Sequence, residues 1–123
     1  MDIHSLAKRF VELCNQGKNF DVMREMYADD IVSVEASGPD TVGKEAVIKK
    51  SERWAAGITI HGEKVTGPYF SKASGDSGQF AVTFAFDITP KSTGQRVTQQ
   101  EVGVYTVQGG KITREQFYYE GAW

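Results

Sequence analysis

The chain has 123 residues, of which 40% are hydrophobic, and its 14 basic and 16 acidic residues give a formal net charge of −2. This length predicts one domain, residues 1–123, whose core is large enough to fold without disulfides or a metal ion. No basic stripe favours nucleic-acid binding, and no apolar stretch has the length of a membrane span. Because the single cysteine, Cys14, has no disulfide partner and no signal-peptide pattern is present, we expect a cytoplasmic protein.

The N-terminal segment predicts an amphipathic helix. Asp2 is suited to cap it, and residues 15–17 contain the glycine that stops it. Its apolar residues recur at the spacing of one helical face: Ile3, Leu6, Ala7, Phe10, Val11 and Cys14. A second, short helix is expected from its cap Asp21 to the acidic pair at 29–30, and a short strand over 31–34 follows at once.

Glu35 stands at the end of that short strand, next to a loop, where catalytic groups are often found. After the turn-rich segment 37–40, a third helix is expected from Gly43 to Ala56, with Gly57 as its C-terminal stop. The acidic pair at 29–30 fits a solvated helix end, and no third ligand stands at a suitable spacing. We therefore predict no metal site and no cofactor.

From Gly57 onward the pattern has the period of two that is typical of strands. Turn-forming clusters at 67–68, 74–78, 90–94 and 109–110 divide it into long antiparallel strands. One strand has an apolar face made of Phe80, Val82, Phe84, Phe86 and Ile88. The last two strands are mixed on both faces, which indicates a sheet that lines a cavity on one side and packs on another subunit with the other. The predicted class is α+β.

The order of these elements resembles the cone-shaped fold of the nuclear transport factor 2-like superfamily. Three segments, Phe10–Gly17, Tyr27–Glu35 and Val107–Ile112, are similar to its SnoaL-like and ketosteroid isomerase-like branches. The resemblance implies a curved mixed or antiparallel sheet of about five strands wrapped around three N-terminal helices. Because this fold hosts isomerases, cyclases, dehydratases, epoxide hydrolases and non-catalytic modules, it implies a fold more than a function.

The resemblance also implies roles for single residues. Glu35 falls where ketosteroid isomerase-like enzymes carry the carboxylate base that moves a proton next to a carbonyl. The two oxyanion donors of those enzymes map onto Phe10 and Gly103, which have no side-chain donor. The implied site keeps the base without its usual oxyanion hole, so ketosteroid isomerase activity is disfavoured.

Strand alternation and the resemblance place Glu101 and Glu115 on the same interior as Glu35. Burial and mutual repulsion raise carboxyl pKa values unequally, so one protonated and one ionised carboxyl would coexist, as general acid–base catalysis requires. In the alternative interpretation each glutamate is solvated or paired with a surface cation, the candidates being Arg53, Arg96, Lys111 and Arg114.

Aromatic residues are candidates either to line a ligand pocket or to fill the core: Trp54, Tyr69, Phe84, Phe86, Tyr105, Phe117 and Tyr119. His61 on the first long strand is a weaker acid–base candidate.

Three functions remain open at this point. A small cofactor-independent enzyme would use Glu35 as base, with Glu101, Glu115 or Tyr105 as acid or donor, to isomerise, dehydrate or hydrolyse a small apolar compound. A carrier would bind such a ligand without chemistry. An interaction module would use its sheet face, and we expect a homodimer formed around Val102, Val104, Gln116 and Tyr118.

Overall fold

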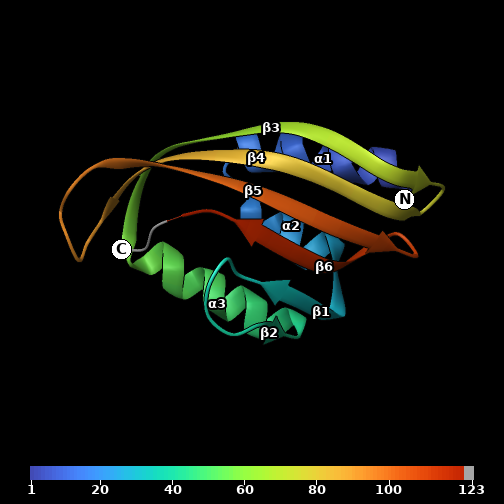
Figure 1. The fold of residues 1–123 in the computed structure, drawn as a ribbon, viewed down its shortest axis with the longest axis horizontal. Helices are drawn as coiled ribbons and strands as arrows, with labels where there is room; N and C mark the ends of the chain where they lie inside the picture. Colours follow the sequence, from blue (N-terminus) through green and yellow to red (C-terminus); the bar gives the residue numbers. More distant parts are fainter. Residues whose placement is uncertain (121–123) are drawn as a thin grey trace.

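A computed structural model describes residues 1–120 as three helices and one six-stranded sheet (Figure 1). The elements in chain order are α1 (Ile3–Asn15), α2 (Asn19–Met26), β1 (Tyr27–Val34), β2 (Thr41–Val42), α3 (Lys44–Ala56), β3 (Ile58–Ser74), β4 (Ser77–Pro90), β5 (Val97–Gln108) and β6 (Lys111–Tyr118). The α+β class is confirmed. The sheet has six strands and not about five, because the two-residue β2 pairs with β1.

The strands lie in the order β2-β1-β6-β5-β4-β3. All neighbours are antiparallel except β1 and β6, which are parallel. This parallel pair joins the two halves of the chain, and it sets Ser33 opposite Glu115. In Figure 1, α1 and α2 lie behind the curved sheet and α3 runs beneath it, so the helices cover one face and leave the other bare.

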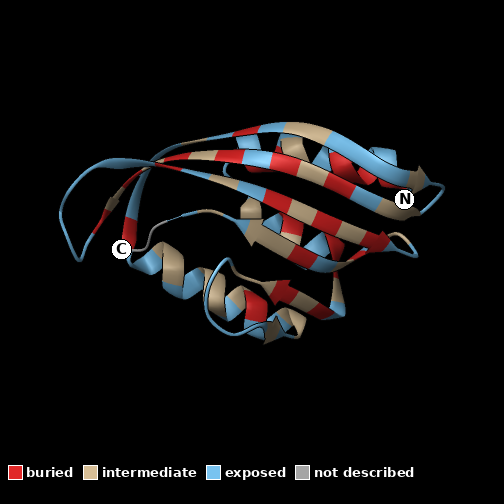
Figure 2. Cartoon of the chain, in the orientation of Figure 1, coloured by how far each residue is buried: buried red, intermediate tan, exposed pale blue. Residues whose placement is uncertain are grey.

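The core lies between the helices and the inner face of the sheet. Burial alternates along β4 and β5 (Figure 2), and the predicted apolar face of β4 is buried from Phe80 to Ile88. The predicted cap of α1 is confirmed, since the Asp2 carboxylate accepts a 2.8 Å hydrogen bond from the Ser5 amide. No helix within residues 1–120 is both long and apolar enough to cross a membrane.

Two boundary predictions were wrong around α2 and β1. The helix begins at Asn19, with Asp21 in its first turn, and it ends at Met26. The strand begins at Tyr27, so Asp29 and Asp30 belong to β1 and do not form a helix end. The reason is that β1 pairs with β6. This pairing begins with Tyr27 opposite Ile112 and favours an extended backbone from Tyr27 onward.

The turn predicted at residues 67–68 is also absent, because Gly67 and Pro68 lie inside β3. The ladder between β3 and β4 shifts register there, between Thr66 and Tyr69. β3 is one of the two edge strands of the sheet, and a proline without an N–H is tolerated at an edge or a bulge.

Candidate functional site

A cavity of about 750 Å³ lies between the helices and the inner face of the sheet. Its volume is within the range of pockets that bind small molecules. Nine of the ten glutamate and aromatic candidates from the sequence line this cavity: Glu35, Trp54, Phe84, Phe86, Glu101, Tyr105, Glu115, Phe117 and Tyr119. Tyr69 does not, because it is exposed on the edge strand β3. The binding and catalytic roles of the nine stay predictions.

Glu115 is the most deeply buried of the three glutamates, with 2% of its surface exposed. It accepts hydrogen bonds from the Tyr27 hydroxyl and, at 2.6 Å, from Ser33 Oγ. Burial raises the pKa of the Glu115 carboxyl, and these two hydrogen bonds and the nearby Lys50 charge oppose that rise. Both oxygens of Glu115 are therefore occupied within the protein.

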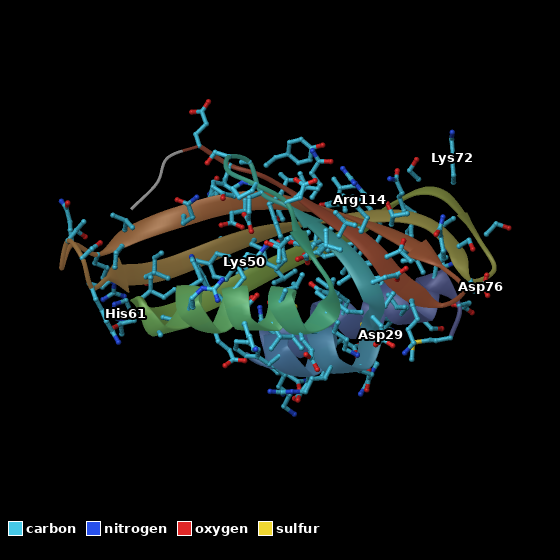
Figure 3. The ribbon with its side chains drawn as sticks, turned by 90° about the horizontal axis from the view of Figure 1, so that it is seen from below. Asp29, Lys50, His61, Lys72, Asp76 and Arg114 are labelled. Carbon is cyan, nitrogen blue, oxygen red and sulfur yellow. The ribbon has the colours of Figure 1, made fainter. Side chains whose placement is uncertain are left out.

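Lys50 extends the polar network from Glu115 to Glu35. Its ammonium group lies between α3 and the sheet (Figure 3) and donates to Ser33 Oγ at 2.7 Å and to Glu35 Oε1 at 2.8 Å. The other oxygen, Glu35 Oε2, accepts a 2.8 Å hydrogen bond from the Tyr119 hydroxyl. The cation that pairs with Glu35 is thus Lys50 and none of the four basic residues considered from sequence.

Glu101 differs from the other two glutamates because its carboxyl has no hydrogen-bond partner within residues 1–120. It lies opposite Phe84 in the β4–β5 ladder and faces the cavity. Burial, and next the charge of Glu35, raise the pKa of Glu101 to about 7. A carboxyl that titrates near neutral pH is suited to donate or accept a proton.

Tyr105 brings a second free polar group to the cavity. Its ring packs on Phe10 and Phe80, with centroids 4.6 and 5.1 Å apart, and only 1% of the residue is exposed. Its hydroxyl has no partner among the described residues, and burial raises its pKa, so the phenol keeps its proton.

Gly103 makes room for this phenol. A Cβ at Gly103 would lie 2.8 Å from Tyr105 Cε2 and 3.0 Å from Tyr105 Oη, closer than side chains approach. The hydroxyl of Tyr105 therefore stands beside the position that the resemblance left without an oxyanion donor.

Comparisons with known proteins identify the family and the fold of the chain. The SnoaL-like domain family matches residues 1–119. The chain belongs to the SnoaL-like domain family. A candidate SnoaL-like polyketide cyclase from Mesorhizobium loti is 51% identical, with a TM-score of 0.87 over 97% of this chain and 100% of that chain. Among the curated proteins searched, none matches the chain.

Two more distant structures show the same fold. One is a hypothetical protein with a ketosteroid isomerase-like fold from Catenulispora acidiphila, solved in complex with trimethylamine, with 18% identity and a TM-score of 0.72 over 94% of this chain and 85% of that one. The other is a candidate isomerase from Bacillus subtilis, with 18% identity and a TM-score of 0.69 over 94% and 84% of the two chains. The predicted family resemblance is confirmed.

Four polar residues of this SnoaL-like domain were missed from the sequence: Tyr27, Ser33, Lys50 and Glu63. Lys50 stands three residues after the buried Val47 and four before Trp54, which places it on the inward face of α3. Ser33 stands two residues after the buried Ile31 in β1 and two before Glu35, which follows the strand. A charge on an apolar helix face and a serine at an inward strand position were the available signals.

Glu63 is a fourth carboxyl in the cavity of the SnoaL-like domain. Asn19 Nδ2 donates to it at 2.8 Å, and burial raises its pKa against that hydrogen bond. His61 also lines the cavity, but its ring is exposed and its Nε2 lies 2.7 Å from Thr89 Oγ1. Within residues 1–120, no three His, Cys, Asp or Glu side chains are grouped so as to hold a metal ion.

Proposed function

We propose that this SnoaL-like domain binds a small molecule with an apolar body in its cavity and catalyses a proton transfer on it. Glu35 acts as the base, and the reaction is an isomerisation, a dehydration or a hydrolysis. The observation that supports the proposal is the combination of a fixed carboxylate, Glu35, with two unpartnered donors in one aromatic cavity, Glu101 and Tyr105.

Each group has a distinct chemical task in this proposal. The hydrogen bonds from Lys50 and Tyr119 hold the Glu35 carboxylate in one orientation, while each oxygen keeps a second lone pair that can accept a proton. The free Tyr105 hydroxyl or the protonated Glu101 donates to the substrate oxygen on which negative charge develops. Lys50 uses two of its three N–H groups within the protein, so the third remains for the same oxygen.

The test uses a generic proton-abstraction probe, 5-nitrobenzisoxazole, a planar compound that opens when a base removes its C–H proton. We expect Glu35→Gln to lower kcat/KM by about a hundredfold, the effect typical of a lost general base. The matched control is Glu52→Gln, which removes an exposed carboxyl of α3. Retention of full activity by Glu35→Gln, with near-ultraviolet circular dichroism showing an intact fold, would reject Glu35 as the base.

A second candidate function is ligand binding without chemistry. It is favoured by the fact that both oxygens of Glu35 already accept hydrogen bonds within the protein. A carrier would be stabilised thermally by its ligand and would show no turnover of the probe in either the parent protein or Glu35→Gln.

A further inference from the structure

Two carboxyl groups flank a pair of stacked phenylalanines on the inner face of the sheet. The rings of Phe84 and Phe86 are 5.6 Å apart and nearly parallel, with an interplanar angle of 6°. Phe84 lies opposite Glu101 on β5, and Phe86 lies opposite Glu63 on β3. Trp54 of α3 meets Phe86 edge-on at 5.3 Å, and all five side chains line the cavity.

The charges of the cavity are out of balance. Four carboxyl groups line it, whereas Lys50 is the one Lys or Arg among its lining residues within 1–120, and Lys50 is paired with Glu35. Glu63 and Glu101 thus have no cation beside them, and burial raises the pKa values of both. Buried carboxylates without a counter-charge are costly, so a binding partner with a positive charge would relieve the imbalance.

A second and independent sign of a polar ligand is the Tyr105 hydroxyl. The residue is 1% exposed, lines the cavity, and has no hydrogen-bond partner in the described part of the chain. The oxygen of this hydroxyl is accessible from the cavity and not sealed in the core, so a ligand in the cavity can complete its hydrogen bonding. Its lone pairs can accept from an ammonium N–H or from a hydroxyl of the ligand.

We infer that the ligand carries a cationic nitrogen, as a protonated or quaternary amine, held against the Phe84–Phe86 stack between Glu101 and Glu63. The inference rests on the proposed ligand-binding function and names the class of its ligand. Aromatic walls attract such cations through their ring faces, and a neighbouring carboxylate adds a direct charge interaction inside a cavity of low dielectric. A neutral ligand would gain only the apolar contact and would leave both carboxyls unmatched.

The test compares two probes of the same shape, benzyltrimethylammonium and neopentylbenzene, in which a carbon replaces the charged nitrogen. Binding is followed by amide chemical shifts of cavity residues at about pH 8, where Glu101 is mostly ionised. We expect the cation to bind about tenfold more tightly than its neutral isostere. Glu101→Gln should remove most of this preference, and the exposed-site control Glu52→Gln should keep it.

A second variant guards against loss of structure in the first. Phe84→Leu keeps most of the apolar volume and removes the ring, so it should weaken the binding of benzyltrimethylammonium more than the binding of neopentylbenzene. Equal or tighter binding of neopentylbenzene to the parent protein, or a cation preference that survives both Glu101→Gln and Glu63→Gln, would overturn the inference. In those cases the ligand-binding proposal stands, whereas failure of both probes to shift any cavity residue contradicts both proposals.

Discussion

Glu101 faces the cavity at a cost in stability. It has no hydrogen-bond partner within residues 1–120, and the charge of Glu35, which follows β1, acts on it together with burial. Tyr119, which follows β6, and Tyr105 of its own strand also feel its charge. An acid in such a place weakens the folded state whenever it is ionised.

We therefore predict that Glu101→Gln stabilises the protein at high pH. The pKa rises from 4.5 in the unfolded chain to about 7 in the folded protein, so the folded state binds the proton more tightly. The contribution of Glu101 to stability is full below pH 4.5, falls as the pH rises to about 7, and is constant above that. At about pH 8 the variant should gain at most about 3 kcal/mol in its free energy of unfolding, and near pH 4 nothing.

Urea unfolding across this pH range measures the effect, with Glu52→Gln as the exposed control. Glu63 and Glu115 also have raised pKa values, so part of the fall in stability with pH should remain in the variant. An unchanged pH slope in Glu101→Gln would show that Glu101 is not the titrating group.

Single residues of the site divide into those that strand alternation predicts and those that it does not. Glu101 and Tyr105 lie on the inner face because side chains alternate along β5, whereas in β6 the buried Ile112 and Glu115 are three residues apart because the β5–β6 ladder shifts register between them. Lys50 was missed because a lysine on a helix is usually solvated, and only the packing of α3 on the sheet turns its position inward. The pairing of Lys50 with Glu35 depends on that tertiary contact, which no local pattern contains.

At the scale of elements, Asn15 fastens the end of α1 to the edge strand β3. Its Nδ2 donates to the Val65 carbonyl at 3.0 Å, and its Oδ1 accepts from the Val65 amide at 2.8 Å. The Asn15 side chain thus satisfies both the N–H and the C=O of the buried Val65, which point to the free edge of β3 where no further strand pairs. This clamp also fixes one wall of the cavity, which Asn15 lines.

We predict that Asn15→Ala lowers the free energy of unfolding by about 2 kcal/mol, because both Val65 groups lose their partner. Chemical denaturation measures this, with Gln16→Ala at the next, exposed position as the control. Asn15→Asp should lower the free energy of unfolding by an amount between those of Asn15→Ala and Gln16→Ala, since it keeps the acceptor and loses the donor. A cost for Asn15→Ala no greater than that for Gln16→Ala would contradict the clamp.

The elements also show where local patterns fail. The boundaries of α1 and α3 follow from spacing and capping residues, which act within a few residues of each other. β1 starts four residues earlier than its apolar run suggests, because its partner β6 lies at the other end of the chain. β3 continues through Gly67 and Pro68 because it is an edge strand, and its place in the sheet is a property of the whole topology.

At the scale of the whole molecule, the bare outer face of the sheet carries the predicted dimer contact. Val102 lies opposite Tyr118 and Val104 opposite Gln116, so the four residues form one patch on β5 and β6. Val102 and Tyr118 are 39% and 52% exposed, and neighbouring outward positions on β4 and β1 are uncharged: Ala81, Thr83 and Val34. The central part of a protein–protein interface typically has few charged residues and is enriched in aromatic residues such as tyrosine.

We predict that the protein is a homodimer and that Tyr118→Arg dissociates it. A two-fold axis would bring equivalent patches together, so each dimer would receive two new cations in a desolvated contact. Light scattering should give twice the chain mass for the parent protein at micromolar concentration and the chain mass for the variant. Ala46→Arg adds the same charge to an exposed site on α3, in the helical layer, and should leave the dimer intact. A monomeric parent protein would exclude self-association through this face, whereas a dimer that survives Tyr118→Arg would place the contact elsewhere on the molecule.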